Sequence, residues 1–432
     1  MSLASTIASA AMGQSIESTA IIRALAFEAG GVGQSATWFQ DTRLPATQAV
    51  RVNAVASDAA ASDDSDLRSI AHIGTIISTT AVALGETLQR SGIDLLAAMI
   101  LGYEVAGRID ESLTPGRMQR GFHGSVSTVF AAAVTAARLI GLDAERTAHA
   151  IVLAATSIGG MAIAADTSCS REYHAGNAAM LGLQAAQAAA RGFKGELTVL
   201  EAPRGFLSAM NGQEIEEITA DLGRDWDIVT DMAIKLMPGA HPFHATAEAA
   251  ADAAHKGNIN PDDISRVTIS AAVQWTNFRG EPHPRNLVDA AHSLVYFVAA
   301  SIVERQFDWN AMTLEKMMDP VIAAVQDKVV FDPDPPPLPD RFPHRHGGAV
   351  SIVLNDGREF SSRCVAPRGS GPRGIEWADV ESKYRNLVPM AGLGSARMEH
   401  SLQLLRTFDS LDRITDLTDL LTLPTKYSAS MS

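Results

Sequence analysis

Two short stretches place a histidine at the start of an alanine-rich segment, where the imidazole could transfer protons. His123 lies between glycines in GFHGS, and His174 follows Arg171 by one helical turn in SREYHAG. An imidazole can act as acid or base near neutral pH, and a guanidinium can bind a carboxylate through two parallel hydrogen bonds. These residue types therefore indicate proton transfer on a molecule that carries carboxylates.

A structural role for the same residues stays open, because His123 could pack locally, Arg171 could form a salt bridge and His174 could cap a helix. A helix N-terminus, however, offers free N–H groups and the positive end of the helix dipole, and both suit a carboxylate. Two such stretches, each opening an alanine-rich helix, favour a functional site.

A third stretch, KLMPGAHPFH, places Lys235, His241 and His244 in one loop, where the sequence changes from a mostly helical to a mixed α and β pattern. Pockets are common at domain boundaries, so these side chains are candidates for the same site. The His241-x-x-His244 spacing could bind a metal, but no CxxC, HExxH or paired carboxylate accompanies it, so we predict no metal site. Cys169 could be a nucleophile beside Arg171, although a small buried side chain is the favoured interpretation.

Composition excludes several classes of protein. The chain has 432 residues, a net charge of −14 and a pI near 5.3, which argues against nucleic-acid binding. It contains no P-loop, no strand–GxGxxG–helix pattern and no GxSxG elbow. What remains is a local concentration of Arg, Lys and His in an acidic protein, which predicts a cofactor-free pocket for a polycarboxylate.

The same sequence predicts a cytoplasmic protein without membrane spans. Its two cysteines are far apart, and its first residues lack the basic region of a secretory signal. The most apolar run, residues 150–165, is short and rich in Ala and Gly, so we expect a buried core helix.

Residues 1 to about 240 read as mostly helical. We expect a helix from about Val126 that stops at Gly141, a second helix capped by Asp143, and a third from about 176 to 191. Antiparallel helices joined in this way form a bundle.

After Pro238 the pattern becomes mixed and predicts a small α+β domain. Alternating β-branched residues predict strands, and Asn-Asp-Gly predicts a hairpin turn. The expected strands are 266–273, 328–331 and the hairpin 349–365, and the expected helices are 244–257, 286–304 and 320–326. Residues 332–340 read as a stiff proline-rich connection.

Helical sequence then resumes. We therefore predict a mainly α protein in which residues 1–240 and 371–432 form a discontinuous all-helical bundle and residues 241–370 form an inserted α+β lid domain.

Four stretches together resemble the MmgE/PrpD family: GFHGS, REYHAGNAAMLGLQAAQAAARGFKG, KLMPGAHPFHA and DAAHSLVYFVAA, in this order. That family includes 2-methylcitrate dehydratase, cis-aconitate decarboxylase and iminodisuccinate epimerase. The resemblance implies a helical domain with an α+β lid, a homodimer, no cofactor, and a di- or tricarboxylate bound between the domains.

The resemblance also implies roles for single residues. His72 and His123 would be the acid and base, with Lys235 and Tyr296 as further catalytic residues. The remaining matched positions would bind substrate: Arg171, His174, His241 and Asp64.

This sequence departs from the family pattern at two places. Ala61 stands where a leading aspartate is common, and Arg171 stands where many members have lysine. Arginine keeps its proton near neutral pH, so Arg171 can only be an anchor. The leading hypothesis is a dehydratase-like lyase that transfers a proton α to a carboxylate. Epimerisation, decarboxylation and carboxylate binding without catalysis are the alternatives in the same pocket.

Overall fold

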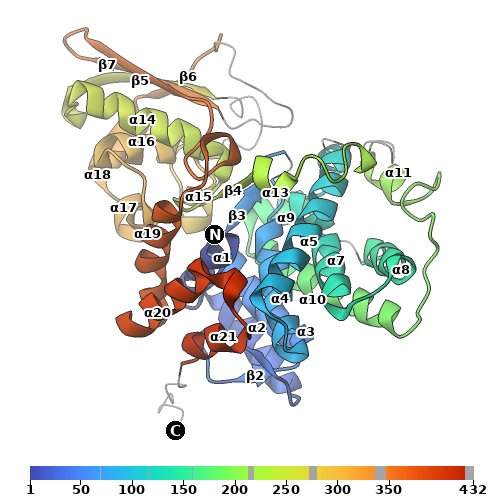
Figure 1. Cartoon of the computed structure of the whole chain (residues 1–432). Helices are drawn as coiled ribbons and strands as arrows, with labels where there is room; N and C mark the ends of the chain where they lie inside the picture. The colour runs from blue at the N-terminus through green and yellow to red at the C-terminus, as the bar shows by residue number, and fades with distance from the viewer. Residues whose placement is uncertain are drawn as a thin grey trace. The chain divides into compact units, whose positions relative to one another are not determined.

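The chain folds into two compact units in a computed structural model that describes residues 1–68, 70–114, 116–157, 159–212, 218–271, 280–335 and 347–423. The first unit comprises Met1–Ile234 and Glu376–Ser432, and the second comprises Lys235–Ile375 (Figure 1). The boundaries predicted from the sequence, at residues 240 and 371, differ from these by a few residues. The mainly α prediction is confirmed. Within the described ranges, no helix has the length and apolarity needed to cross a bilayer.

The first unit is built from helices and two small sheets. Its longer helices are α1 (Ser2–Gly13), α2 (Glu17–Ala29), α3 (Ala46–Ala59), α4 (Ile73–Leu88), α5 (Gly92–Leu113), α7 (Thr128–Ile140), α8 (Ala144–Ala155), α10 (Ser170–Ala190), α19 (Trp377–Leu387) and α20 (Ser395–Arg406). Its shorter helices are α6 (Gly116–Gln119), α9 (Ala162–Thr167), α11 (Phe206–Met210), α13 (Asp227–Thr230) and α21 (Thr415–Leu421). Strands β1 (Ser35–Ala36) and β2 (Arg43–Leu44) pair antiparallel, as do β3 (Asp64–Asp66) and β4 (Met232–Ile234). Figure 1 shows the C-terminal helices α19, α20 and α21 packed among the helices of this unit.

Small residues let α10 lie close to its neighbours α3 and α7. A Cβ added at Gly182 would lie 2.3 Å from the carbonyl oxygen of Val129 on α7. A Cβ added at Gly176 would lie 2.5 Å from a methyl carbon of Val55 on α3. Such distances are far below van der Waals contact, so these two positions admit only glycine unless the helices move apart. These two glycines thus allow α10 to pack closely against α3 and α7.

Local signals placed several helix ends correctly. Gly141 ends α7 with φ of +83°, and the Asp143 side chain accepts a hydrogen bond from the Arg146 N–H at the start of α8. The start of α10 was predicted too late, because the helix begins at Ser170. Arg171 and His174 therefore lie within its first two turns and not ahead of them.

The prediction of one core helix over residues 150–165 is wrong. Helix α8 ends at Ala155 and α9 begins at Ala162. Between them Gly160 adopts φ of +120°, a conformation that favours glycine. Its carbonyl accepts a hydrogen bond from the His123 N–H at 2.9 Å, so the break in the helix holds the GFHGS loop.

The second unit is a four-stranded sheet covered by helices, with strand order β6-β5-β7-β8. Its elements are α14 (His244–Gly257), β5 (Ile264–Ala271), α15 (Leu287–Ala291), α16 (Leu294–Glu304), α17 (Leu314–Met317), α18 (Pro320–Gln326), β6 (Val329–Phe331), β7 (Gly348–Leu354) and β8 (Glu359–Cys364). Strands β5 and β6 are parallel, and the predicted β7–β8 hairpin is confirmed. Figure 1 shows α14 and α16 on one face of the sheet.

Two details of the second unit differ from the sequence prediction. The helix expected over 286–304 is divided, because the Ser293 side chain accepts a hydrogen bond from the Tyr296 N–H and starts α16 anew. The proline-rich stretch 332–340 lies in part outside the described residues, as do the last two residues of the strand predicted at 266–273.

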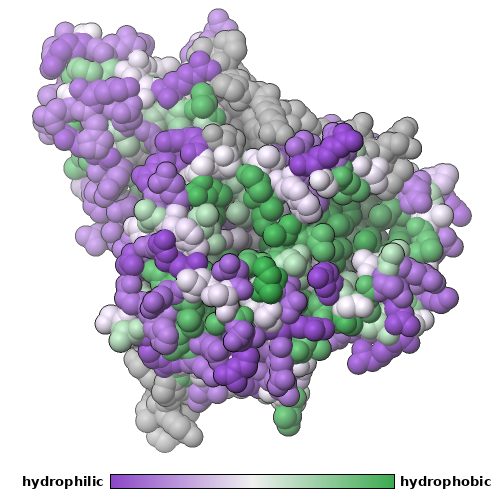
Figure 2. Space-filling view, viewed as in Figure 1, coloured by the Kyte–Doolittle hydropathy of each residue, from purple (hydrophilic) through white to green (hydrophobic). Residues whose placement is uncertain are grey.

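A hydrophobic surface lies on the outer side of α5. Ile100, Leu101 and Val229 are 36%, 36% and 69% exposed. They line a cavity of about 550 Å³ together with Ala97, Arg138, Trp226 and Ile228. Figure 2 shows hydrophobic residues gathered over the part of the first unit where Figure 1 draws α5.

A buried charged cluster lies beside the β3–β4 pair. Arg68 donates hydrogen bonds to the carboxylates of Glu111, Asp227 and Asp231. Asp227 is 3% exposed, and burial raises its pKa to about 6 although Arg68 acts in the opposite direction. Folding therefore costs free energy whenever this carboxyl must be ionised.

Replacing Asp227 with asparagine should flatten the pH dependence of stability. The folded pKa of about 6 exceeds the ordinary value of 3.8, so this group destabilises the folded state progressively as pH rises from 3.8 to 6. Relative to the wild type, D227N should gain about 2 kcal/mol of unfolding free energy between pH 4 and pH 7, measured by urea unfolding. The exposed Asp225 provides the matched D225N control. Parallel stability curves for D227N and the wild type would contradict this electrostatic account.

Candidate active site

His72 stands at the start of α4 and turns one ring nitrogen toward two buried carboxylates. Its Nδ1 lies 2.7 Å from Asp63 Oδ2 and 2.8 Å from Asp58 Oδ1. Asp63 Oδ2 also accepts a hydrogen bond from the Thr75 hydroxyl at 3.0 Å. Because the carboxylates hold Nδ1, any proton transfer by His72 to a ligand goes through Nε2.

The neighbouring Asp64 has a different task. Its two oxygens accept hydrogen bonds from the backbone N–H groups of Gly74 at 2.8 Å and Thr75 at 3.1 Å. This arrangement caps the N-terminus of α4, which places His72 at a fixed point. We therefore assign Asp64 to helix capping and do not carry it forward as a substrate ligand.

Arg171, in the first turn of α10, binds the end of α3. Its Nε donates to Asp58 Oδ2 at 2.8 Å and its Nη2 donates to the Asp58 carbonyl at 2.6 Å. Burial by itself would raise the pKa of Asp58, but the positive charges of Arg171 and His72 outweigh burial and hold the pKa well below its usual range. Asp58 is thus an ionised, buried carboxylate between the Arg171 guanidinium and the His72 imidazole.

His123 lies in the loop between α6 and the short 3₁₀ turn Gly124–Ser127, across from His72. The two ring centroids are 6.3 Å apart and the ring planes make an angle of 54°. Burial, followed by the positive charges of His72 and Arg171, lowers the pKa of His123 well below its usual range. At neutral pH His123 is therefore an uncharged base.

His174 lies one turn further along α10, beside the helix break. A Cβ added at Gly160 would lie 3.1 Å from its Nδ1, and burial lowers the pKa of the imidazole. The first unit therefore brings together four of the residues singled out in the sequence: His72, His123, Arg171 and His174.

The remaining predicted residues belong to the second unit. Lys235 is its first residue and directly follows Ile234, which pairs with Asp64 in the β3–β4 ladder. The imidazoles of His241 and His244 have their centroids 4.7 Å apart at the start of α14.

The hydroxyl of Tyr296 is bonded inside the second unit. It donates to the Ala311 carbonyl at 2.5 Å within the hydrophobic core, and burial raises the pKa of Tyr296 to about 12. Since this proton is held by a buried carbonyl, we do not carry Tyr296 forward as a proton donor.

Asp58, Asp63 and His72 also have a spacing that a metal ion could use, with one ligand atom from each within 4.8 Å of the others. The Arg171 guanidinium bonded to Asp58 places a positive charge beside this group, which opposes a second cation. The same contacts are explained by hydrogen bonds to His72, and metal-free chemistry stays a prediction.

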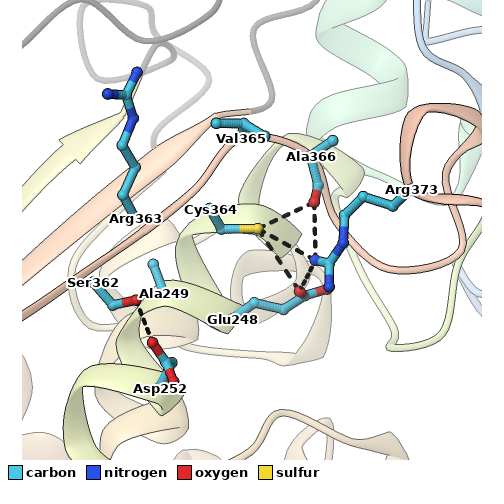
Figure 3. Close-up of a pocket in the computed structure, with 9 residues that line it drawn as sticks. All are labelled: Glu248, Ala249, Asp252, Ser362, Arg363, Cys364, Val365, Ala366 and Arg373. Carbon is cyan, nitrogen blue, oxygen red and sulfur yellow. Dashed lines mark hydrogen bonds and ion pairs between the residues drawn. The ribbon is translucent and has the colours of Figure 1, made fainter. Parts of the chain in front are cut away.

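A second cavity, of about 380 Å³, lies between α14 and β8 (Figure 3). Figure 3 shows Glu248, Cys364 and Arg373 directed toward one another, and Arg373 forms an ion pair with Glu248 at 2.5 Å. Burial and the charge of Glu248 raise the pKa of the Cys364 thiol to about 11. Cys169 is exposed, so the expectation of a buried side chain is wrong, and partial burial of its thiol, followed by the charge of Glu172, raises the thiol pKa. Neither environment activates the thiol as a nucleophile.

Sequence reasoning did not single out Asp58 as a site residue. It is an aspartate near the C-terminal end of α3, within a run of small and apolar residues, and it is 0% exposed. A carboxylate in such a run is the one local signal that marks it, because buried charges require partners.

Comparisons with known proteins identify the family of the chain. The MmgE/PrpD N-terminal domain profile matches residues 2–218 and the MmgE/PrpD C-terminal domain profile matches residues 237–405. The chain is 28% identical to cis-aconitate decarboxylase of Homo sapiens over 405 residues, which cover 90% of this chain and 82% of the human protein. It is 27% identical to cis-aconitate decarboxylase of Aspergillus terreus over 420 residues, which cover 88% and 81% of the two chains. Since the two domain profiles together span most of its length, the chain belongs to the MmgE/PrpD family.

Proposed function

We propose that this protein is a cofactor-independent lyase that acts on a small di- or tricarboxylate. The observation that carries the proposal is the pair of imidazoles of His72 and His123, 6.3 Å apart, with His72 against two carboxylates and His123 uncharged. Two titratable groups whose surroundings favour opposite protonation states can act as acid and base. The curated relatives are named cis-aconitate decarboxylases, which makes cis-aconitate the first substrate to test.

The two imidazoles account for a dehydration, and His72 alone accounts for the proton transfer of a decarboxylation. In a dehydration, His123 takes the proton α to a carboxylate, and the hydroxyl at the β carbon leaves as water with the proton that His72 gives from Nε2. In a decarboxylation, the carbon–carbon bond breaks, CO₂ leaves, and the electron pair left on carbon takes the proton of His72. The dehydration places extra negative charge on carboxylate oxygens and the decarboxylation places it on carbon, and the cationic Arg171 would stabilise either charge.

Epimerisation is the alternative in the same pocket. His123 would remove the α proton, and His72 would return a proton to the opposite face of the same carbon. No carbon–carbon or carbon–oxygen bond would break. A carboxylate-binding protein without turnover is the remaining alternative.

The family resemblance supplies the rest of the proposed site. Arg171, His174 and His241 would bind the carboxylates of the substrate, and Lys235 would assist catalysis. These roles suit the residue types, because Arg, Lys and His recognise carboxylates through charge-assisted hydrogen bonds.

We also propose that the protein works as a cytoplasmic homodimer, as the resemblance implies. The exposed apolar surface of Ile100, Leu101 and Val229 supports an association, since exposed apolar patches mark interaction sites. Light scattering should give twice the 45.7 kDa chain mass, and a monomer at micromolar concentration would contradict the dimer.

The reaction itself is decided by the products formed from carboxyl-labelled cis-aconitate, citrate, 2-methylcitrate and an amino-linked diacid. Release of labelled CO₂ from cis-aconitate identifies a decarboxylase, and a new alkene formed from a hydroxy acid without CO₂ identifies a dehydratase. Loss of stereochemical purity alone identifies an epimerase. Binding of these acids without any of the three changes would overturn the enzymatic proposal.

A further inference from the structure

Asp58 connects three helices at one point of the first unit. It lies at the end of α3, its Oδ2 binds Arg171 of α10 at 2.8 Å, and its Oδ1 lies 2.8 Å from Nδ1 of His72 at the start of α4. The side chain is fully buried, so its negative charge is not screened by water.

Two carboxylates face Nδ1 of His72, and one of them is enough to orient the ring. Nδ1 carries one proton, yet it faces Asp63 Oδ2 at 2.7 Å as well as Asp58 Oδ1 at 2.8 Å. Asp63 is also held by the Thr75 hydroxyl, so it suffices to fix the ring. The contribution of Asp58 is therefore its charge, which favours the protonated form of the imidazole.

Asp58 also fixes the guanidinium. Its carboxylate and its own carbonyl accept from Nε and Nη2 of Arg171, so the guanidinium is anchored through two of its nitrogens. Arg171 in turn is one of the charges that keep His123 uncharged. Asp58 thus acts directly on the proton donor, and it holds in place the cation that lowers the pKa of the base, although the charge of Asp58 itself acts on that pKa in the opposite direction.

Resting on the function proposed above, we propose that Asp58 is a positioning residue that keeps His72 protonated as the acid and holds Arg171 in place beside the base. It does not itself touch the substrate. Its role would be to give the imidazoles of His72 and His123 different protonation states.

The test compares D58N with the wild type by steady-state kinetics and by nitrogen-15 NMR of the histidine rings. The amide keeps the size and removes the charge, so kcat should fall about 10²-fold. The alkaline limb of the kcat profile should also move to lower pH, because His72 then loses its proton more readily. The ring nitrogens of His72, assigned with H72N, should report an imidazolium at pH 7 in the wild type and a neutral ring in D58N.

Two further variants separate this role from general destabilisation. E86Q removes another buried carboxylate, which binds Ala36 N–H, Arg43 and Thr418 far along α4, and it should leave the pH profile unchanged. D58N/R171Q removes both charges of the ion pair, so it replaces D58N in the test if D58N does not fold. His72 should be neutral in this double variant as well. An imidazolium at His72 in either Asp58 variant, or a neutral ring in the wild type, would overturn the proposal. The NMR result can be read whether or not any carboxylate is turned over, so failure of this proposal is distinguishable from failure of the proposed function.

Discussion

In a reaction that begins with removal of an α proton, replacing His123 with asparagine should lower kcat by about 10²- to 10⁴-fold, the range expected for loss of a general base. Asparagine can accept a hydrogen bond but cannot take a proton from carbon. The backbone of this loop is held by the His123 N–H bond to the Gly160 carbonyl, which the substitution keeps. The free energy of unfolding should therefore change by no more than about 1 kcal/mol. Steady-state kinetics and thermal unfolding of the same preparation provide the measurement.

A second histidine substitution provides the control. His400 is exposed on α20, and H400N should keep wild-type kcat. If H123N retained more than about a tenth of the wild-type kcat, His123 would not be the base.

Replacing Arg117 with methionine should destabilise the protein by about 3 to 5 kcal/mol, the cost of leaving a buried charge unpaired. Arg117 is 0% exposed, and its Nη1 lies 2.9 Å from Asp110 Oδ1 and donates to the Thr114 hydroxyl. Ser127 donates to the same carboxylate. Arg117 and Ser127 stand at the two ends of the loop that carries His123, so R117M should also lower kcat. Denaturant unfolding followed by circular dichroism measures the stability.

Removing both charges should cost less than removing one. R117M/D110N no longer buries an unpaired carboxylate, so it should recover at least half of the stability lost in R117M. An R117M protein within about 1 kcal/mol of the wild type would show that the Asp110–Arg117 pair is not needed to hold the loop.

The parts of the fold that sequence predicted well are those with local chemical causes. Gly141 can end α7 because it adopts a positive φ, and Asp143 caps the next helix through its own side chain. The errors arose where tertiary contacts decide. Helix α10 begins at Ser170, and its first turn carries Arg171, which binds Asp58, a residue 113 positions earlier; no local pattern shows that bond.

The candidate site shows the same division. His72, His123 and Arg171 could be predicted because imidazole and guanidinium groups are rare in glycine- and alanine-rich surroundings. The sequence did not show which of two adjacent aspartates faces His72, because adjacent side chains near a strand point in different directions. In the structure Asp63 contacts His72, and Asp64 caps the N-terminus of α4.

The central claim is that His72 and His123 together move protons on a small polycarboxylate. Proton NMR in D₂O, with citrate, 2-methylcitrate, cis-aconitate and an amino-linked diacid, tests it most directly. We predict that the wild type changes an alkene signal or exchanges an α proton of at least one acid, that folded H72N changes none at a comparable rate, and that folded H123N loses every change that begins with removal of an α proton. Equal turnover by the wild type and both variants, or silence of the folded wild type across the set, would contradict the account.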